Sequence, residues 1–309
     1  MAVPCLAAEL PMPGPRRFPL PLIAAFFALY VIWGSTYLVI RIGVEYWPPL
    51  MLAGIRFCTA GALMYGYLRW RGVPAPTWAQ WKAAGMIGIL LLTFGNGAVS
   101  VAEHTGVTSG VAALAVATVP LFTLLCGYFW GARNTRLEWA GVILGMIGIA
   151  MLNMGSNLQS SPLGAGLLLF AAASWAFGSV WSRHLPLPQG AMASAAEMLI
   201  AGVVLLIGSA LKGEHLEAMP PVEGWLALAY LTVFGSIIAF NAYMYLLKHV
   251  RPAAATSYAY VNPAVAVLLG IVFVGETIGL EEALAMLVII SAVLLISLPQ
   301  WRKPKPEIR

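Results

Sequence analysis

Four ionisable residues lie inside or at the end of long apolar stretches of this sequence, where charge is costly. Arg56 and Glu197 stand about seven residues inside two such stretches, and an unpaired charge at the centre of a membrane helix costs about 2.5 to 3.5 kcal/mol. Glu103 and His104 are adjacent near the end of a third stretch, so they could hold a coupling proton or meet a cation. We predict that these four residues serve coupling or gating. The structural alternatives are helix-end pairing or snorkelling for the first two and simple solvation for the other two.

A polar stripe runs along the stretch that ends at His104. Asn96, Ser100 and His104 follow one another at steps of four, which places them on one face of a helix. A polar face in an otherwise apolar helix indicates a lining for a bound molecule. The alternative is that small polar side chains join neighbouring helices, at about 0.6 kcal/mol per contact, and Asn96 between two glycines fits this interpretation equally well.

Aromatic side chains are concentrated on a few of the apolar stretches. Trp and Tyr usually mark the membrane surfaces, yet Trp33, Trp175 and Tyr260 fall well inside their stretches. With Asn241 and Asn262 they could line an amphipathic cavity suited to organic molecules, including cations that contact aromatic faces. The cavity residues expected on these grounds are Trp33, Ser35, Tyr37, Asn96, Ser100, Trp175, Ser179, Asn241, Tyr258, Tyr260 and Asn262.

The stretch 251–276 repeats an earlier part of the chain. Shifted back by 143 positions it falls on 108–133, and Pro263 then coincides with Pro120. A proline inside a membrane helix frees a carbonyl one turn earlier, and such a feature repeated in two halves points to a central binding site. We therefore assign the two prolines to gate mechanics. Polar side chains of the second copy, such as Asn262, have apolar or small counterparts in the first, so recognition is expected to rest mainly on the C-terminal half.

Composition places the chain in a membrane. Of its 309 residues, 61% are hydrophobic and only 9% are charged, whereas about a quarter of the residues of a soluble protein are charged. All 12 acidic residues are glutamates, and Cys5, Cys58 and Cys126 have no ligand-like spacing, so we expect no metal site, no cofactor and no catalytic residues. The net charge of +5 lies in the links between apolar stretches, which indicates orientation in a bilayer and no nucleic-acid partner. Because no Walker-type phosphate loop occurs, ATP is not expected to drive the chain directly.

Ten apolar stretches are long enough to cross a membrane, which takes about 20 residues. Backbone amides in lipid must be satisfied within their own segment, so the stretches predict an all-α membrane protein of ten transmembrane helices. They cover 20–40, 49–69, 80–101, 107–130, 136–154, 163–182, 191–211, 222–246, 252–274 and 281–298. We divide the chain into an N-terminal tail (1–19), two five-helix units (20–154 and 163–298) and a basic C-terminal tail (299–309).

Positive charge sets the expected orientation. With the N-terminus in the cytoplasm, the 17 Lys and Arg residues all fall on that side except Arg41, Lys212 and the intramembrane Arg56. Both termini are therefore expected to be cytoplasmic. Five helices in each unit force the second unit to enter the membrane from the opposite side, which gives an inverted repeat with two equivalent gates around one central site.

Several short motifs occur in a known order and spacing. They are WGSTY at 33–37, AEH at 102–104, ATVPLF at 117–122, SWAFGS at 174–179, FGSIIA at 234–239, NAYMYL at 241–246, ATSYAYVNP at 255–263 and GE at 275–276. From about residue 24 to residue 298 the sequence resembles the EamA family of the drug/metabolite transporter superfamily. The resemblance implies two inverted five-helix EamA repeats around a central cavity, and relatives that export amino acids, drugs and diverse metabolites. Many members carry Gly-Glu after their fourth helix, whereas the first half here reads Gly131-Ala132-Arg133, which puts any function of that glutamate in doubt there.

Together these features predict a secondary transporter that exports small organic metabolites or drugs across the bacterial inner membrane. Alternating access and proton coupling are the expected mechanism. A flippase for lipid-linked substrates, or a membrane binding component, is the alternative, and an enzyme is disfavoured by the missing aspartates. The expected partners are a small-molecule substrate and the lipid bilayer, with the chain acting as a monomer or a homodimer.

Overall fold

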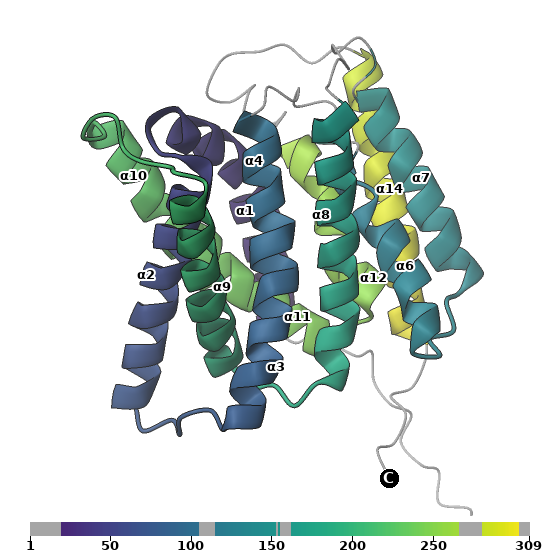
Figure 1. The fold of residues 1–309 in the computed structure, drawn as a ribbon. Helices are drawn as coiled ribbons and strands as arrows, with labels where there is room; N and C mark the ends of the chain where they lie inside the picture. The colour runs from purple at the N-terminus through teal and green to yellow at the C-terminus, as the bar shows by residue number, and fades with distance from the viewer. Residues whose placement is uncertain (1–19, 105–114, 153, 155–161, 266–279, 303–309) are drawn as a thin grey trace, which may run out of the picture.

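The computed structural model describes residues 20–104, 115–152, 154, 162–265 and 280–302. Its described helices lie over the apolar stretches, and the described residues contain no strand, so the prediction of an all-helical protein is confirmed. Figure 1 shows the helices standing side by side, with the described links between them at the ends of the helices.

The first half of the chain contains a bent helix, a straight helix, one long composite rod and two further helices. Helix α1 is bent by 41° near residue 37. The elements in chain order are α1 (Leu20–Tyr46), α2 (Pro49–Trp70), α3 (Trp78–Gly88), the π-helix η1 (Ile89–Gly97), α4 (Ala98–His104), α6 (Val119–Phe129) and α7 (Arg136–Leu152).

The second half repeats this order. Its third rod, like that of the first half, has a π-helix between two α-helices. Its elements are α8 (Pro162–Trp181), the short η2 (Ser182–His184), α9 (Ala191–Leu211), α10 (Val222–Tyr230), the π-helix η3 (Leu231–Phe240), α11 (Asn241–His249), α12 (Pro252–Ala255), helical turns at 258–265 and α14 (Leu280–Arg302). Because π-helices are rare and frequently mark functional sites, their recurrence in matching rods indicates a functional site beside them.

Local sequence explains where helices begin and end. Helix α2 starts with Pro49, whose missing amide costs nothing in a first turn. Helix α3 starts with a capping box in which Thr77 and Gln80 satisfy each other's backbone amides. After α2 the chain turns through Gly72, whose φ of 81° suits a glycine.

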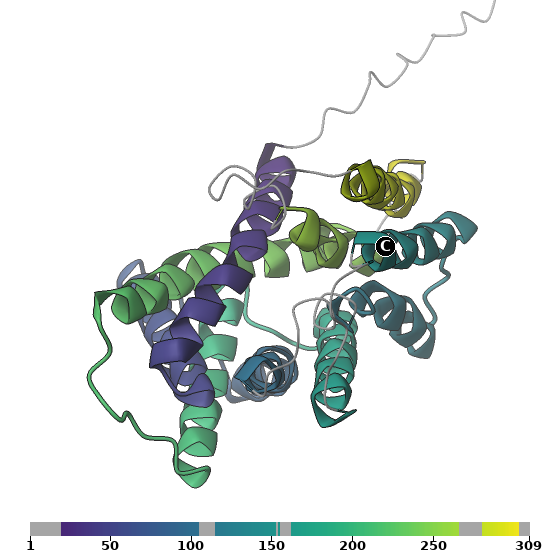
Figure 2. The same cartoon turned by 90° about the horizontal axis from the view of Figure 1, so that it is seen from above.

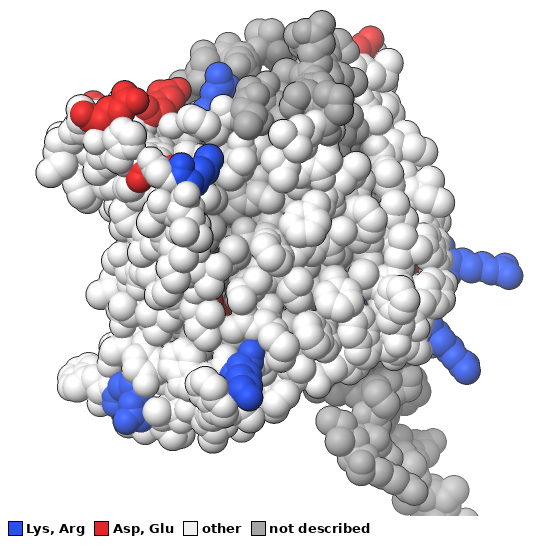
Figure 3. Space-filling view, in the orientation of Figure 1, with Lys and Arg blue, Asp and Glu red and all other residues white. Residues whose placement is uncertain are grey.

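Four rods are long and apolar enough to cross a membrane by length and composition. They are Trp78–Ala102, Leu163–His184, Ala191–Leu211 and Val222–His249, and α1 adds a fifth if its two bent parts form one span. Ten spans therefore remain a prediction. Figure 3 shows a flank of the molecule that is nearly free of charge across its middle. Acidic atoms gather at the upper end, over α10. Lys and Arg atoms lie at the lower end, on the right, and in two patches near the top.

Two pairs of helices pack most closely, α2 with α9 and α7 with α14. Figure 2 shows the second pair side by side at one edge of the bundle. Glycines allow this approach: a Cβ at Gly202 of α9 would lie 2.5 Å from the backbone nitrogen of Cys58 in α2. On α7, a Cβ at Gly141 would lie 2.9 Å from the carbonyl oxygen of Ala292 in α14. Small residues at such contacts let helix backbones approach in membranes, where packing drives association.

Candidate functional site

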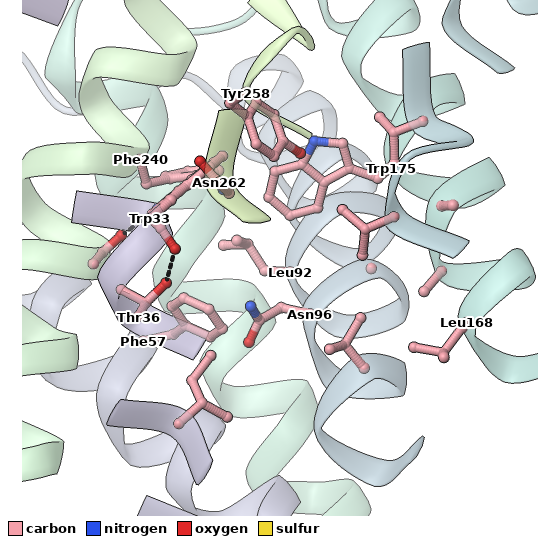
Figure 4. Close-up of a pocket in the computed structure, with 18 of the residues that line it drawn as sticks. Trp33, Thr36, Phe57, Leu92, Asn96, Leu168, Trp175, Phe240, Tyr258 and Asn262 are labelled. Carbon is pink, nitrogen blue, oxygen red and sulfur yellow. Dashed lines mark hydrogen bonds between the residues drawn. The ribbon is translucent and has the colours of Figure 1, made fainter. Parts of the chain in front are cut away.

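A cavity lies in the interior of the bundle, between elements of both halves of the chain (Figure 4). Its empty space is about 760 Å³, the open mouth included. Both π-helices contribute to its wall. The lining residues are Trp33, Thr36, Ile40, Arg56, Phe57, Leu92, Gly95, Asn96, Val99, Val116, Val119, Leu168, Ala171, Ala172, Trp175, Gly235, Phe240, Tyr258 and Asn262.

Aromatic rings from both halves form one side of this cavity. The ring centroid of Trp33 lies 4.8 Å from that of Tyr258 and 5.5 Å from that of Trp175, both in edge-to-face contact. Behind them, Tyr243 of α11 lies 5.3 Å from Trp33 and 5.5 Å from Trp175. Edge-to-face pairs at these distances are the favoured aromatic geometry. The cluster therefore ties α1, α8, α11 and the turns at 258–265 together and gives the cavity a fixed aromatic wall.

The indole N–H groups of this wall already have acceptors. Trp33 Nε1 donates to the carbonyl of Gly235 in η3 over 3.1 Å, and Trp175 Nε1 donates to the hydroxyl of Tyr243 over 2.9 Å. The same hydroxyl lies 2.5 Å from Ser179 Oγ. The two tryptophans therefore offer a ligand their rings and not their N–H groups.

Three polar side chains of the cavity have hydrogen-bonding capacity left over. The Oδ1 atoms of Asn96 and Asn262 are buried with no partner among the described residues. Arg56 is 5% exposed, and its Nε donates to Ser236 Oγ over 2.7 Å. No described residue accepts from its terminal nitrogens. Because buried polar groups are nearly always bonded in native proteins, these three side chains indicate where a bound molecule would make polar contacts.

The structure thus brings together Trp33, Arg56, Asn96, Trp175, Tyr258 and Asn262 of the residues predicted from the sequence. It does not bring the three predicted serines to the wall. Ser35 Oγ donates to Ile32 O over 2.7 Å and contacts the Tyr230 hydroxyl, while Ser100 and Ser179 donate to the carbonyls four residues earlier. Such back-bonding is the usual way for a serine to satisfy its hydroxyl inside a helix.

Two further predicted cavity residues join helices instead of lining the cavity. Asn241 donates to Ile237 O over 2.6 Å and to the sulfur of Met64 over 3.2 Å. Tyr260 is fully buried, and its hydroxyl donates to Val142 O in α7 over 3.2 Å. Its ring lies so close to α7 that a Cβ at Gly145 would be 2.7 Å from it. The side chain of Tyr37 lies outside the described residues.

The residues predicted to couple or gate occupy different places. Glu197 is fully buried in α9, and neither carboxylate oxygen has a partner among the described residues. His104 is exposed at the end of α4, and the side chain of Glu103 lies outside the described part. Pro120 is buried in the first turn of α6, whereas Pro263 is half-buried in the turns at 258–265.

Sequence reasoning missed several residues of this region. Thr36, Phe57 and Phe240 line the cavity, but nothing in a continuously apolar helix indicates which of its faces meets a ligand. It also missed an ion pair between the halves: Arg251, just before α12, donates through Nε and Nη2 to the carboxylate of Glu138 in α7. Opposite charges at the ends of two stretches are the signal that could have indicated it. Among the described residues, no group of three or more His, Cys, Asp or Glu side chains is placed to hold a metal ion.

Asn262 and Tyr260 are expected to respond differently to replacement by alanine. Asn262→Ala removes a cavity amide whose Oδ1 has no partner among the described residues, so it should change which solutes bind and leave the thermal unfolding temperature nearly unchanged. Tyr260→Ala empties a buried site and should lower the free energy of unfolding by about 3 to 5 kcal/mol, whereas Tyr260→Phe should cost only about 1 kcal/mol. Thermal unfolding and ligand binding of the purified variants measure both effects. Equal loss of stability in the two alanine variants would contradict the assignment.

Comparison with known proteins identifies the family. The model of the EamA-like transporter family matches residues 20–154 and 162–298. The chain is 56% identical to the inner membrane transporter YedA of Escherichia coli K12 over 290 residues, which cover 94% of this chain and 95% of that protein. It is 28% identical to a protein of Salmonella typhimurium named "probable amino-acid metabolite efflux pump", over 85% of this chain and 91% of that one.

The fold has a counterpart among solved structures. A crystal structure with 21% sequence identity superposes with a TM-score of 0.73, covering 91% of this chain and 99% of the other. At that identity the likeness concerns the fold alone. The two family matches and the 56% identity cover nearly all of the described helices, so the chain is an all-helical membrane protein that belongs to the EamA-like transporter family.

Proposed function

We propose that the protein is a secondary transporter that exports small organic metabolites or drugs across the bacterial inner membrane. The observation that carries the proposal is the cavity between the two halves, with an aromatic wall and three polar side chains whose bonding capacity is not filled by any described residue. Small-molecule sites are typically concave, mostly apolar and equipped with a few placed polar groups. The names of two similar proteins, an inner membrane transporter and an efflux pump, support the same function and membrane.

The two halves are proposed to be inverted repeats, residues 20–154 and 163–298, with five membrane helices each. Reciprocal contacts support this arrangement, since α1 packs against η3 of the second half and α8 packs against η1 of the first. The closest pairs, α2 with α9 and α7 with α14, join elements that hold the same position in each half. A pseudo-two-fold axis in the membrane plane would produce this pattern, and rocking of the halves about it would give alternating access.

One end of the bundle is proposed to be a closed gate. The pair of Glu138 and Arg251 joins the halves where the chain enters α7 and α12, in the lower half of the bundle in Figure 1. With both termini in the cytoplasm, as the distribution of Lys and Arg favours, this end faces the cytoplasm. Opening it would require the ion pair to break. Transport would then alternate between a state that keeps the pair and a state that lacks it.

A comparison of released metabolites tests the function. Cells with and without the protein are compared by untargeted analysis of their medium, and candidate solutes are then measured with the purified full-length protein in liposomes. We expect at least one class of small organic solute to be released only when the protein is present. No release of amino acids, bases or cationic drugs, together with movement of a labelled lipid headgroup between leaflets, would favour the flippase alternative instead.

Glu197 is proposed to carry the coupling proton. The Glu197→Gln variant keeps the shape of the side chain and removes its proton exchange, so flux in liposomes should lose its response to a pH gradient. The matched control is Glu217→Gln, because Glu217 is exposed in the link before α10. If the pH gradient stimulates Glu197→Gln as strongly as the unmodified protein, coupling through this residue is wrong.

A further inference from the structure

We infer that Arg56 forms an anion subsite in the cavity, and that the transported solutes are small organic monoanions, carboxylates above all, with a flat apolar body. The inference deepens the proposed function and rests on it as far as transport is concerned. The binding of an anion at Arg56 follows from the cavity alone, so the two claims can fail separately.

The guanidinium of Arg56 is held in place, but most of its N–H donors have no acceptor among the described residues. It belongs to α2, is 5% exposed and lines the cavity. Its Nε donates to Ser236 Oγ of η3 over 2.7 Å, and its central carbon lies 4.7 Å from the ring centre of Phe57. Space for it is made by Gly235, where a Cβ would be 3.0 Å from Nη2. An arginine has five N–H donors, and the four on its terminal nitrogens have no acceptor among the described residues.

No described carboxylate neutralises this cation. Glu138 is buried but pairs with Arg251, and Glu197 is buried but does not line the cavity. A buried charge without a partner is strongly unfavourable. A cavity that contains an unpaired cation is therefore expected to bind most tightly a ligand that brings a negative charge. The terminal nitrogens of an arginine match the two oxygens of a carboxylate in a bidentate pair.

The single positive charge limits the class of anion. Arg56 is the one Lys or Arg among the described lining residues. A monoanion such as a carboxylate would be neutralised, whereas a doubly charged phosphate monoester would leave a net charge in a site of low polarity. Phosphorylated solutes are therefore expected to bind less well than carboxylates of the same size.

The other lining residues of the cavity indicate which chemical groups the rest of the ligand carries. Trp33, Trp175 and Tyr258 offer ring surfaces, because the indole N–H groups are already bonded. Asn96 and Asn262 each present an acceptor oxygen that has no partner in the described part of the chain. These oxygens accept from a hydroxyl or amine on the solute. An aromatic acid with a hydrogen-bond donor away from its carboxylate could contact the Arg56 guanidinium, the aromatic rings and the asparagine oxygens at the same time.

Three probes with one skeleton and different head groups test this inference. They are 4-hydroxyphenylacetate, its neutral amide and the cation tyramine, and binding to the purified full-length protein is measured by titration calorimetry. Because a charge-assisted hydrogen bond is about twice as strong as a neutral one, the acid should bind at least about tenfold more tightly than the amide or the amine. Equal or weaker binding of the acid, or no binding of it at millimolar concentration, overturns the inference.

Variants then assign the preference to Arg56. Arg56→Gln should lower the affinity for the acid about tenfold or more and leave the affinity for the amide unchanged, while Arg56→Lys keeps part of the preference. Arg41→Gln, at an exposed position of α1, is the matched control and should behave like the unmodified protein. A well-folded Arg56→Gln that still prefers the acid overturns the assignment. If that variant does not fold, the three probes are compared on Arg56→Lys instead. An unchanged preference of Arg56→Lys for the acid, or equal binding of the three probes by the unmodified protein, would then overturn the assignment.

Flux measurements separate this inference from the proposed function. Liposomes that move tyramine and not the acid would preserve transport and overturn the anion subsite. Tight binding of the acid without movement of any probe would preserve the subsite and contradict transport of this solute class. Movement of the acid that is lost in Arg56→Gln and kept in Arg41→Gln supports both.

Discussion

Glu138→Gln is expected to lower the free energy of unfolding by about 2 to 3 kcal/mol and to remove most of the transport activity. The side chain of Glu138 is 1% exposed, and its carboxylate accepts from Arg251, from Thr135 N over 2.7 Å and from Thr135 Oγ1 over 3.0 Å. Glutamine loses the charge that holds Arg251, so the two halves come apart at this end. Because the Arg251 side chain is 30% exposed, the expected cost lies below that of a fully buried pair.

The chain supplies its own control for this prediction. Glu281 is the counterpart of Glu138 at a shift of 143 positions and stands in the first turn of α14, but it is exposed. Glu281→Gln should therefore change neither unfolding temperature nor flux. The sequence explains the asymmetry, since the counterpart of Arg251 is the uncharged Thr108. Thermal unfolding in detergent and flux in liposomes measure both variants. Equal effects of the two would show that the ion pair does not hold the gate.

The positions of the helices followed from the sequence because lipid leaves the backbone little choice. An apolar stretch of about 20 residues must satisfy its own amides and becomes helical, so α2 and α9 lie where the stretches at 49–69 and 191–211 indicate. The π-helices η1 and η3 could not be expected in the same way. Their sequences are more apolar than the α-helices beside them, but a π-helix differs from an α-helix by hydrogen bonds that span one residue more, which hydrophobicity does not report.

The cavity was predictable where helical spacing could be applied and unpredictable where it could not. Tyr258 and Asn262 are four residues apart, share a face and both line the cavity. Tyr260 lies between them in sequence but about 200° away from Tyr258 around a helix, and it packs against α7 instead. Polarity alone therefore misplaced Tyr260. Phe57 and Phe240 went unnoticed for the opposite reason, because they are apolar residues among others of the same kind.

Gly88→Ala is expected to lower the free energy of unfolding by about 2 to 3 kcal/mol, as overpacking of a tight contact does. Gly88 is the last residue of α3, and a Cβ there would lie 2.4 Å from the carbonyl oxygen of Glu197 in α9. Backbone atoms cannot rotate away as a side chain could, so α3 and α9 must separate. The π-helix η1 begins at the next residue and carries Asn96 to the cavity, so binding should weaken together with stability.

Gly66→Ala is the matched comparison, because Gly66 lies in α2 with no atom within 4 Å of the added Cβ. Alanine is the better helix former by about 1 kcal/mol, so the same chemical change should be neutral or stabilising there. Opposite signs of the two shifts in unfolding temperature would show that close contact between the halves, and not glycine flexibility, sets the effect at Gly88. A neutral Gly88→Ala would mean that α3 and α9 have room to move apart at no cost, and that the halves are not held in fixed register beside Glu197.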